Sequence, residues 1–120
     1  EFRRVLFRSM RTYNPDKWVL LKFNHKGKVF YKVLASWYGG FARGDSWKLN
    51  SGVTKIEEDG QCYLFTGSSG SVYQCHKATY GMSAYTMGVL ASFQKQVDET
   101  EDVTLELLPD TTNFMELQYE

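Results

Sequence analysis

The sequence predicts an α+β domain: a mostly antiparallel β-sheet meander, or a partly closed small barrel, with one amphipathic helix packed on it and a C-terminal β-hairpin. Three observations predict this class. Short runs rich in β-branched and aromatic residues recur between turn residues, one stretch has helical periodicity, and the last segments alternate apolar and polar side chains. The 120 residues are 42% hydrophobic and 16% aromatic, which is enough for a packed core and argues against a disordered chain.

The first nine residues are set apart from this fold. EFRRVLFRS at 1–9 matches the in-frame translation of a widely used short-read sequencing adapter. We therefore treat 1–9 as an artefact and 10–120 as a single domain.

The predicted strands follow one another through the first two thirds of the domain. The polar group NHKG at 24–27 separates two apolar runs and predicts a hairpin, and the glycine-rich GGFARGD at 39–45 predicts a surface loop. Asp59-Gly60 favours a type I′ turn, and GSSG at 67–70 favours another tight turn. The six strands predicted between these turns and loops are 17–23, 28–38, 46–50, 53–58, 61–66 and 71–76.

After residue 81 the spacing of the apolar residues changes from a strand pattern to a helical one. Apolar side chains at three-and-four spacing predict an amphipathic helix over 82–97. Alternation at 103–108 and 114–120, around the turn PDTTN, predicts the terminal hairpin. The residues that we expect in the core are Cys62, Leu64, Tyr73, Val89, Leu90 and Phe93.

The two cysteines can be placed by register. If the hairpin of 61–66 and 71–76 closes over GSSG, Thr66 faces Ser71 and Cys62 lies directly opposite Cys75. Buried free thiols are favoured, because cross-strand geometry strains a disulfide; a disulfide and a metal site that adds His76 are the alternatives. We expect no metal and no cofactor.

Charge is divided along the domain. Residues 10–120 hold 11 basic and 13 acidic side chains, a net charge of −2; nine of the basic ones lie in 10–55, and eleven of the acidic ones in 56–120. Ion pairs between basic and acidic strands across the sheet are the favoured explanation, and a partner surface is the alternative. The first hairpin carries a lysine stripe, but the overall charge opposes binding to phosphate backbones, so nucleic acid is not an expected partner.

The segment SWYGGFARGDSWKL at 36–49 is the strongest candidate for a binding site. Aromatic faces stack on bases or sugars, Arg pairs with phosphate, and Asp accepts hydrogen bonds from hydroxyls. Backbone N–H groups of GSSGS can face a phosphate. The alternatives are that these aromatic residues pack in the core and that GSSGS is only a turn. The candidate ligand-binding residues are Trp37, Tyr38, Phe41, Arg43, Asp45, Trp47, Ser69 and Ser71.

No motif for a nucleophile, a catalytic metal or a nucleotide phosphate loop occurs, and neither His25 nor His76 lies beside a nucleophile pattern. We therefore predict a protein that is not an enzyme, with a hydrolase ranked last. No apolar run is long enough to cross a membrane and no secretory signal is visible, so we expect no membrane partner. Eight Tyr and three Trp in so small a domain fit a homo-oligomer.

Two segments carry a resemblance to a known group. YNPDKWVLLKF and GDSWKLNSGVTKIEEDGQCYLFTGSSGSVYQCHKATYG, within 13–81, resemble small accessory proteins of tailed bacteriophages and prophages. The resemblance implies expression in the cytoplasm of a bacterial host and supplies no catalytic residue. It suggests a non-enzymatic counter-defence protein that antagonises a host function by sequestering a nucleotide-like signal molecule. The alternative is a protein-interaction module or acidic mimic that binds a host defence protein directly.

Overall fold

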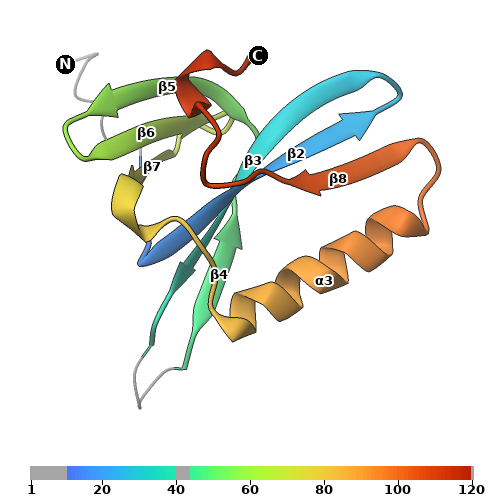
Figure 1. Cartoon of the computed structure of the whole chain (residues 1–120), viewed down its shortest axis with the longest axis horizontal. Coiled ribbons are helices and arrows are strands. Elements are labelled where there is room, and N and C mark those ends of the chain that lie inside the picture. Colours follow the sequence, from blue (N-terminus) through green and yellow to red (C-terminus); the bar gives the residue numbers. More distant parts are fainter. Residues whose placement is uncertain (1–10, 40–43, 120) are drawn as a thin grey trace.

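The computed structural model describes residues 11–39 and 44–119 and shows an α+β fold of two open sheets (Figure 1). Their strand orders are β1-β7-β6-β5, called here the β5 sheet, and β4-β3-β2-β8, called the β2 sheet. Among the named strands, β1 with β7 is the one parallel pairing in the described residues. The elements are β1 (Thr12–Tyr13), β2 (Lys17–His25), β3 (Lys28–Trp37), β4 (Ser46–Leu49), β5 (Val53–Asp59), β6 (Cys62–Gly67), β7 (Val72–His76), η1 (Lys77–Thr79), α3 (Ala84–Asp98), β8 (Val103–Leu107) and η2 (Phe114–Glu116).

The predicted first hairpin is confirmed and forms the centre of the fold. β2 and β3 pair without interruption from Lys17 opposite Ser36 to His25 opposite Lys28. Lys26 and Gly27 both have positive φ, 54° and 86°, as a two-residue type I′ turn requires. Because side chains alternate along each strand, this long hairpin presents one face to the β5 sheet and the other to α3.

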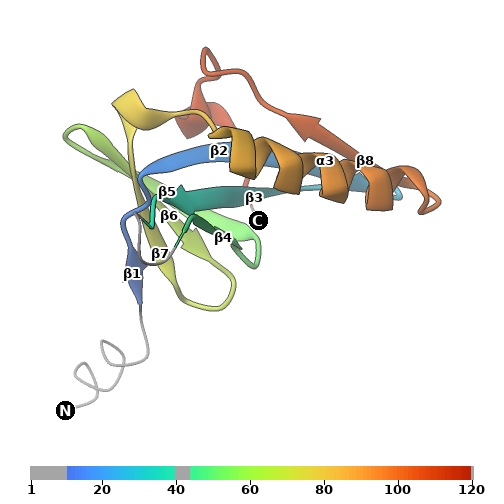
Figure 2. The same cartoon turned by 90° about the horizontal axis from the view of Figure 1, so that it is seen from below.

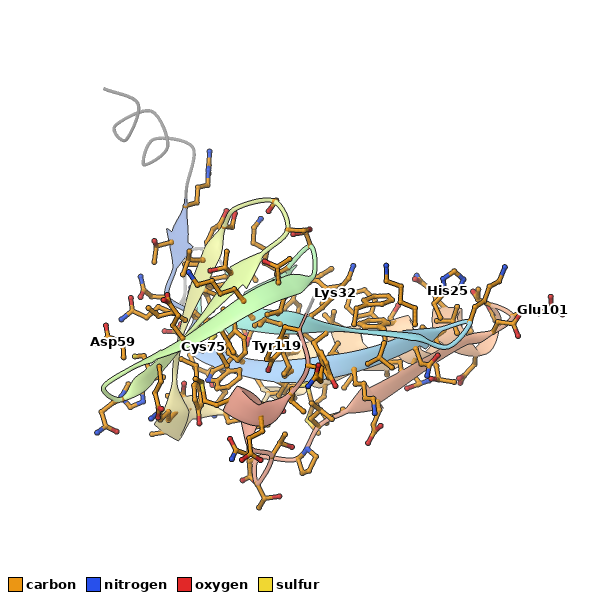
Figure 3. All side chains as sticks on the ribbon, turned by 90° about the horizontal axis from the view of Figure 1, so that it is seen from above. His25, Lys32, Asp59, Cys75, Glu101 and Tyr119 are labelled. Atoms are coloured by element: carbon orange, nitrogen blue, oxygen red, sulfur yellow. The ribbon has the colours of Figure 1, made fainter. Side chains whose placement is uncertain are left out.

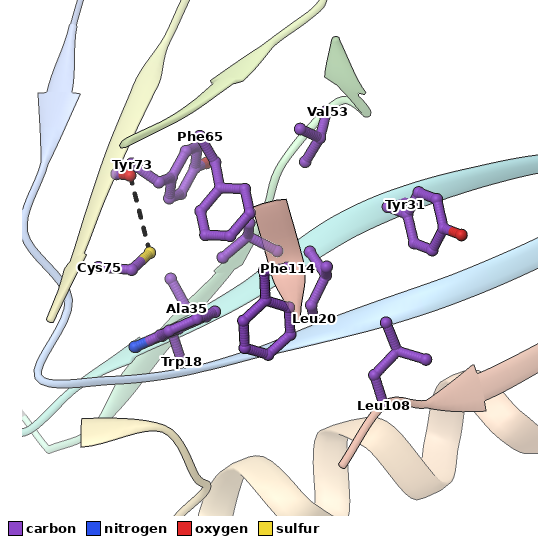
Figure 4. Packing of buried hydrophobic residues seen from close by; sticks show 11 residues of the cluster. Trp18, Leu20, Tyr31, Ala35, Val53, Phe65, Tyr73, Cys75, Leu108 and Phe114 are labelled. Atoms are coloured by element: carbon purple, nitrogen blue, oxygen red, sulfur yellow. Dashed lines mark hydrogen bonds between the residues drawn. The ribbon is translucent and has the colours of Figure 1, made fainter. Parts of the chain in front are cut away.

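The larger core lies between the two sheets and is rich in aromatic rings (Figure 4). Trp18 is 1% exposed, and its indole N–H donates to the His76 carbonyl at 2.7 Å. The rings of Tyr80, Phe65 and Phe114 surround it, with centroid distances of 4.7, 5.4 and 5.4 Å. Edge and tilted contacts of this kind add to the burial of apolar area in holding the sheets together.

The predicted helix is confirmed as α3, which runs alongside the β2 sheet (Figure 2). It begins after Ser83, whose hydroxyl accepts a hydrogen bond from the Thr86 amide at 3.3 Å, the usual N-cap arrangement. The expected core residues Val89, Leu90 and Phe93 are half-buried against a second cluster on β2, β3 and β8. Within the helix only Thr86 is fully buried, so α3 lies on the sheet and keeps much of its surface exposed.

The predicted register of β6 and β7 is wrong by one residue. Tyr63 lies opposite Cys75, and Cys62 lies opposite His76, because the turn takes five residues between Thr66 and Val72. A slip of one residue moves every side chain of a strand to the other face. Phe65 is therefore in the core while Cys62 and Leu64 are only half-buried; the prediction for Tyr73 is confirmed.

Both cysteines are free thiols, as favoured from the sequence. Cys75 is fully buried, and this burial raises the pKa of its thiol well above the usual value. His76 is exposed, on the opposite side of β7 from Cys75. Among the described residues, no three His, Cys, Asp or Glu side chains are grouped to hold a metal ion.

The prediction of a C-terminal hairpin is also wrong. β8 pairs with β2, with Leu107 opposite Leu21, and no second strand follows it up to residue 119. The chain instead crosses back to the core, where Phe114 is 3% exposed and its carbonyl accepts a hydrogen bond from the Tyr119 hydroxyl at 2.8 Å. These aromatic side chains are buried more completely between two sheets than they would be on one face of a terminal hairpin.

The basic and acidic parts of the chain meet where β2 pairs with β8. In the described parts of the chain the ion pairs are Lys55 with Glu57 at 3.6 Å and Lys77 with Glu58. Neither pair links the basic first hairpin to the acidic C-terminal segment. β2 of the basic hairpin pairs with β8 of the acidic segment, and Lys22 lies directly opposite Glu106. The basic and acidic strands are therefore neighbours, as favoured from the sequence, but no ion pair within 4.0 Å joins them in the described residues.

Candidate functional site

The two tryptophans of the predicted binding segment lie on opposite faces of the β2 sheet. Trp37 is opposite Ser46, and Trp47 is opposite Ser36, so the pleat points the two indoles in opposite directions. Trp37 contacts Tyr13 at a centroid distance of 6.2 Å, whereas Trp47 contacts Phe93 of α3 at 5.3 Å. The structure therefore does not bring these indoles together around one ligand.

Two other residues of that segment, Tyr38 and Asp45, lie at an exposed end of the β2 sheet. Tyr38 is 54% exposed, and its backbone N–H donates to the Asp16 carboxylate at 2.8 Å. Asp45 is exposed as well. The predicted ligand-binding residues Phe41 and Arg43 lie outside the described residues.

The serine-rich turn between β6 and β7 uses its backbone amides internally. The N–H of Ser68 donates to the Gly52 carbonyl at 2.8 Å, and that of Ser69 to the Ser51 hydroxyl at 3.0 Å. The Gly67 amide donates to the Ser71 carbonyl at 2.8 Å, and the Gly70 amide donates to the Gly67 carbonyl. Two of these amides hold the turn against the residues before β5 and two close the turn itself, so all four are engaged within the protein.

An apolar groove lies between α3 and β8. Two hollows of about 440 and 360 Å³ adjoin there and share Met82 and Leu107. Large apolar side chains remain exposed in it: Met87 by 56% and Leu107 by 42%. We call this surface the α3–β8 groove, and its lining residues are Val19, Tyr80, Gly81, Met82, Met87, Leu90, Ala91, Gln94, Leu107, Leu108, Pro109 and Asp110.

Tyr80 fixes one end of the α3–β8 groove. Its hydroxyl accepts the Leu20 amide at 3.2 Å and donates to the Leu108 carbonyl at 2.5 Å, which ties β2 to the end of β8. Burial raises the pKa of Tyr80, so the phenol keeps its proton and its role as a donor. The next residue, Gly81, donates its N–H to the Trp18 carbonyl at 2.9 Å and starts the chain toward α3.

The chain segment that forms most of the α3–β8 groove is acidic, and Asp110 is the carboxylate among the groove's lining residues. Residues 81–120 contain one basic side chain, Lys95, and eight carboxylates. Those that the structure describes are all exposed, and they are Asp98, Glu99, Glu101, Asp102, Glu106, Asp110 and Glu116. The groove thus combines a mostly apolar lining with one carboxylate, that of Asp110, and the Lys17 ammonium group lies near its Gly81 end.

Sequence reasoning missed this groove. The sequence pattern includes Met82 in the apolar spacing of the helix and Leu107 in the alternation of a hairpin strand, and the pairing of β8 with β2 beside α3 leaves both at an open surface. The signals that were visible are the methionines in the helix and the acidic C-terminal segment.

A smaller hollow of about 240 Å³ lies between η1 and the segment before η2, with the rings of Trp18, Tyr63, Tyr80 and Phe114 in its wall. The Lys77 ammonium group at its edge stands 5.0 Å from the Tyr63 ring centre and is paired with Glu58. Because this cation already has a carboxylate partner and Asp110 also lines the hollow, the lining offers no uncompensated positive charge to an anionic ligand.

Comparison of the chain with protein-family models, curated proteins and solved structures gave no match. Of the helices in the described residues, none is both long and apolar enough to span a membrane.

Proposed function

We propose that this protein is a non-enzymatic binding protein whose α3–β8 groove binds another protein. The observation that carries the proposal is the exposure of Met87 and Leu107 beside Met82 and Leu90 in one continuous groove. Contiguous exposed apolar surface of this kind is typical of protein-interaction sites, and methionine side chains adapt their shape to a partner.

An open strand edge adds to this surface. β8 has β2 on one side and no strand on its other side within the described residues. Such an edge can add a partner strand, and an amphipathic helix can place its apolar side chains between α3 and β8.

Asp110 in the groove and the acidic composition of the segment that forms most of it favour a basic partner. A segment with apolar anchors and flanking Lys or Arg complements the exposed carboxylates of 98–116. A symmetric dimer through this surface would bring two acidic segments together, so we propose a different protein and not a second copy. With the resemblance to phage proteins, the proposed setting is the cytoplasm of an infected bacterium and the proposed partner is a basic host protein.

The test is site-specific photo-crosslinking in bacteria. A photoreactive benzoylphenylalanine replaces Met87 in the groove or, as the matched control, Met115, which is 40% exposed on η2 and does not line the groove. We expect a crosslinked protein from position 87 and not from position 115. The substitution Met87→Glu should abolish recovery of that protein in a pull-down, while Met115→Glu should retain it.

Equal crosslinking from both positions would contradict the proposal, as would no adduct from position 87. An adduct between two copies of this chain would show that the groove is a homo-oligomer interface and would also overturn it.

A further inference from the structure

A separate hollow of about 330 Å³ lies at the other edge of the β2 sheet, beside the part of β3 that extends past β4. β4 pairs only with Leu34 to Trp37 of β3. The chain then passes through Asn50, whose side-chain oxygen accepts the Val33 amide at 2.8 Å, into β5. The lining residues of this hollow, called the β3–β5 pocket, are His25, Lys28, Phe30, Ser51, Gly52, Val53, Thr54 and Ser68.

The lining of the β3–β5 pocket favours an anion. Lys28 and His25 supply nitrogen donors near the hairpin tip, where Figure 3 labels His25, and no carboxylate is among the lining residues. Glu101 lies beside the same tip in Figure 3 but does not line the pocket. Lys28 has no carboxylate partner within ion-pair distance in the described residues. Its charge is available to a phosphate group.

Two of the three hydroxyl groups in the pocket are weakly engaged, whereas the third, that of Ser51, accepts the Ser69 N–H at 3.0 Å. The Ser68 hydroxyl lies 3.5 Å from the Ser51 carbonyl, and the Thr54 hydroxyl lies 3.3 Å from the Thr66 carbonyl. Hydrogen bonds between oxygens are usually ~2.5–3.0 Å long. The hydroxyls of Ser68 and Thr54 can therefore rotate toward a ligand at a small cost in free energy.

An aromatic ring completes the pocket. Phe30 stacks on Phe23 with ring centres 5.3 Å apart and planes at 4°, which holds its orientation. The Lys32 ammonium group is 5.9 Å from the Phe30 ring centre and adds positive charge nearby. A flat ring in a ligand can pack on Phe30 while its anionic group reaches Lys28.

We propose that the β3–β5 pocket binds a phosphorylated aromatic molecule of mononucleotide size. Lys28 and His25 bind the phosphate, the hydroxyls of Ser68 and Thr54 bind the sugar, and Phe30 packs on the base. The volume is near the lower limit of the ~300–1,000 Å³ usual for ligand sites, which suits one nucleotide and not two. The site does not share a residue with the α3–β8 groove, so it is independent of the proposed protein partner.

The test is a ¹H–¹⁵N NMR titration of the full chain at low salt with the four ribonucleoside monophosphates. Adenosine and inorganic phosphate serve as separate probes of the two halves of the ligand. We expect shifts at His25, Lys28 and Ser68, and tighter binding of at least one nucleotide than of either probe. Lys28→Ala should weaken that binding about tenfold, as the loss of one charge-assisted hydrogen bond implies. The matched control Lys95→Ala removes the same charge from α3 and should leave it unchanged.

Three outcomes would overturn the proposal: no shifts at millimolar nucleotide, inorganic phosphate binding as tightly as every nucleotide, or shifts confined to the 37–47 segment. The crosslinking result at Met87 is unaffected by any of them, so failure of this pocket and failure of the α3–β8 groove can be told apart.

Discussion

Replacing Phe114 with alanine tests whether the C-terminal segment is part of the core. The Phe114 ring is 3% exposed, and its centre lies 5.4 Å from Trp18, 5.6 Å from Tyr63 and 5.3 Å from Tyr80. Truncating a buried phenylalanine costs about 3–5 kcal/mol, because apolar burial is lost and a cavity remains. Domains of this size have total stabilities of ~5–15 kcal/mol, so the expected loss is a large fraction of the free energy of unfolding.

The assay is urea unfolding followed by tryptophan fluorescence. With a slope of ~2 kcal/mol per molar urea, the midpoint should fall by about 1.5–2.5 M. Met115→Ala is the matched control, since its side chain is 40% exposed on the neighbouring position, and it should change stability by less than ~0.5 kcal/mol. A loss below ~1 kcal/mol for Phe114→Ala, or equal losses for both variants, would refute the docking of η2 between the sheets.

Three further predictions follow from buried polar groups. Burial keeps the Cys75 thiol protonated in the fold, with its pKa well above the ordinary 9.0, and raises the pKa of Tyr73 from 10.0 to about 12. Because the unfolded chain loses these protons at lower pH than the folded one, the free energy of unfolding should decline as pH rises above about 9. Melting temperatures measured from pH 7 to 11 check this decline. The substitution Tyr73→Phe should make the melting temperature fall less steeply with pH. Ser83→Ala removes the N-cap of α3 and should cost about 1 kcal/mol in chemical denaturation, with Ser83→Asp restoring most of it. Asn50→Ala leaves the Val33 amide without its buried acceptor and should cost about 1–3 kcal/mol, with faster hydrogen exchange at Val33; an unchanged exchange rate would contradict this role.

The identity of most elements could be predicted from the sequence because their causes are local. Asn24, Lys26 and Gly27 specify a tight turn between two apolar runs, and the hairpin forms there. The three-and-four spacing after Ser83 gives a helix because it places apolar side chains on one side. These patterns depend on near neighbours in the chain, so the hairpin turn and the helix can be predicted without knowing the tertiary structure.

Register and partner choice were decided by the tertiary structure. One extra residue in the β6–β7 turn moves Cys62 away from Cys75 and turns Phe65 into the core, a difference that composition does not reveal. The pairing of β8 with β2 depends on a contact between distant parts of the chain.

The tertiary structure also decided where the candidate sites lie. The sequence located the aromatic and charged segments, but the pairing of β3 with β4 sends Trp37 and Trp47 to opposite faces. The α3–β8 groove and the β3–β5 pocket each combine side chains from separate elements. The sequence by itself determined which residues carry apolar surface and charge, because composition and local pattern are enough for that. Only the tertiary structure decided which of them share a surface, because that depends on which strands pair and in which register.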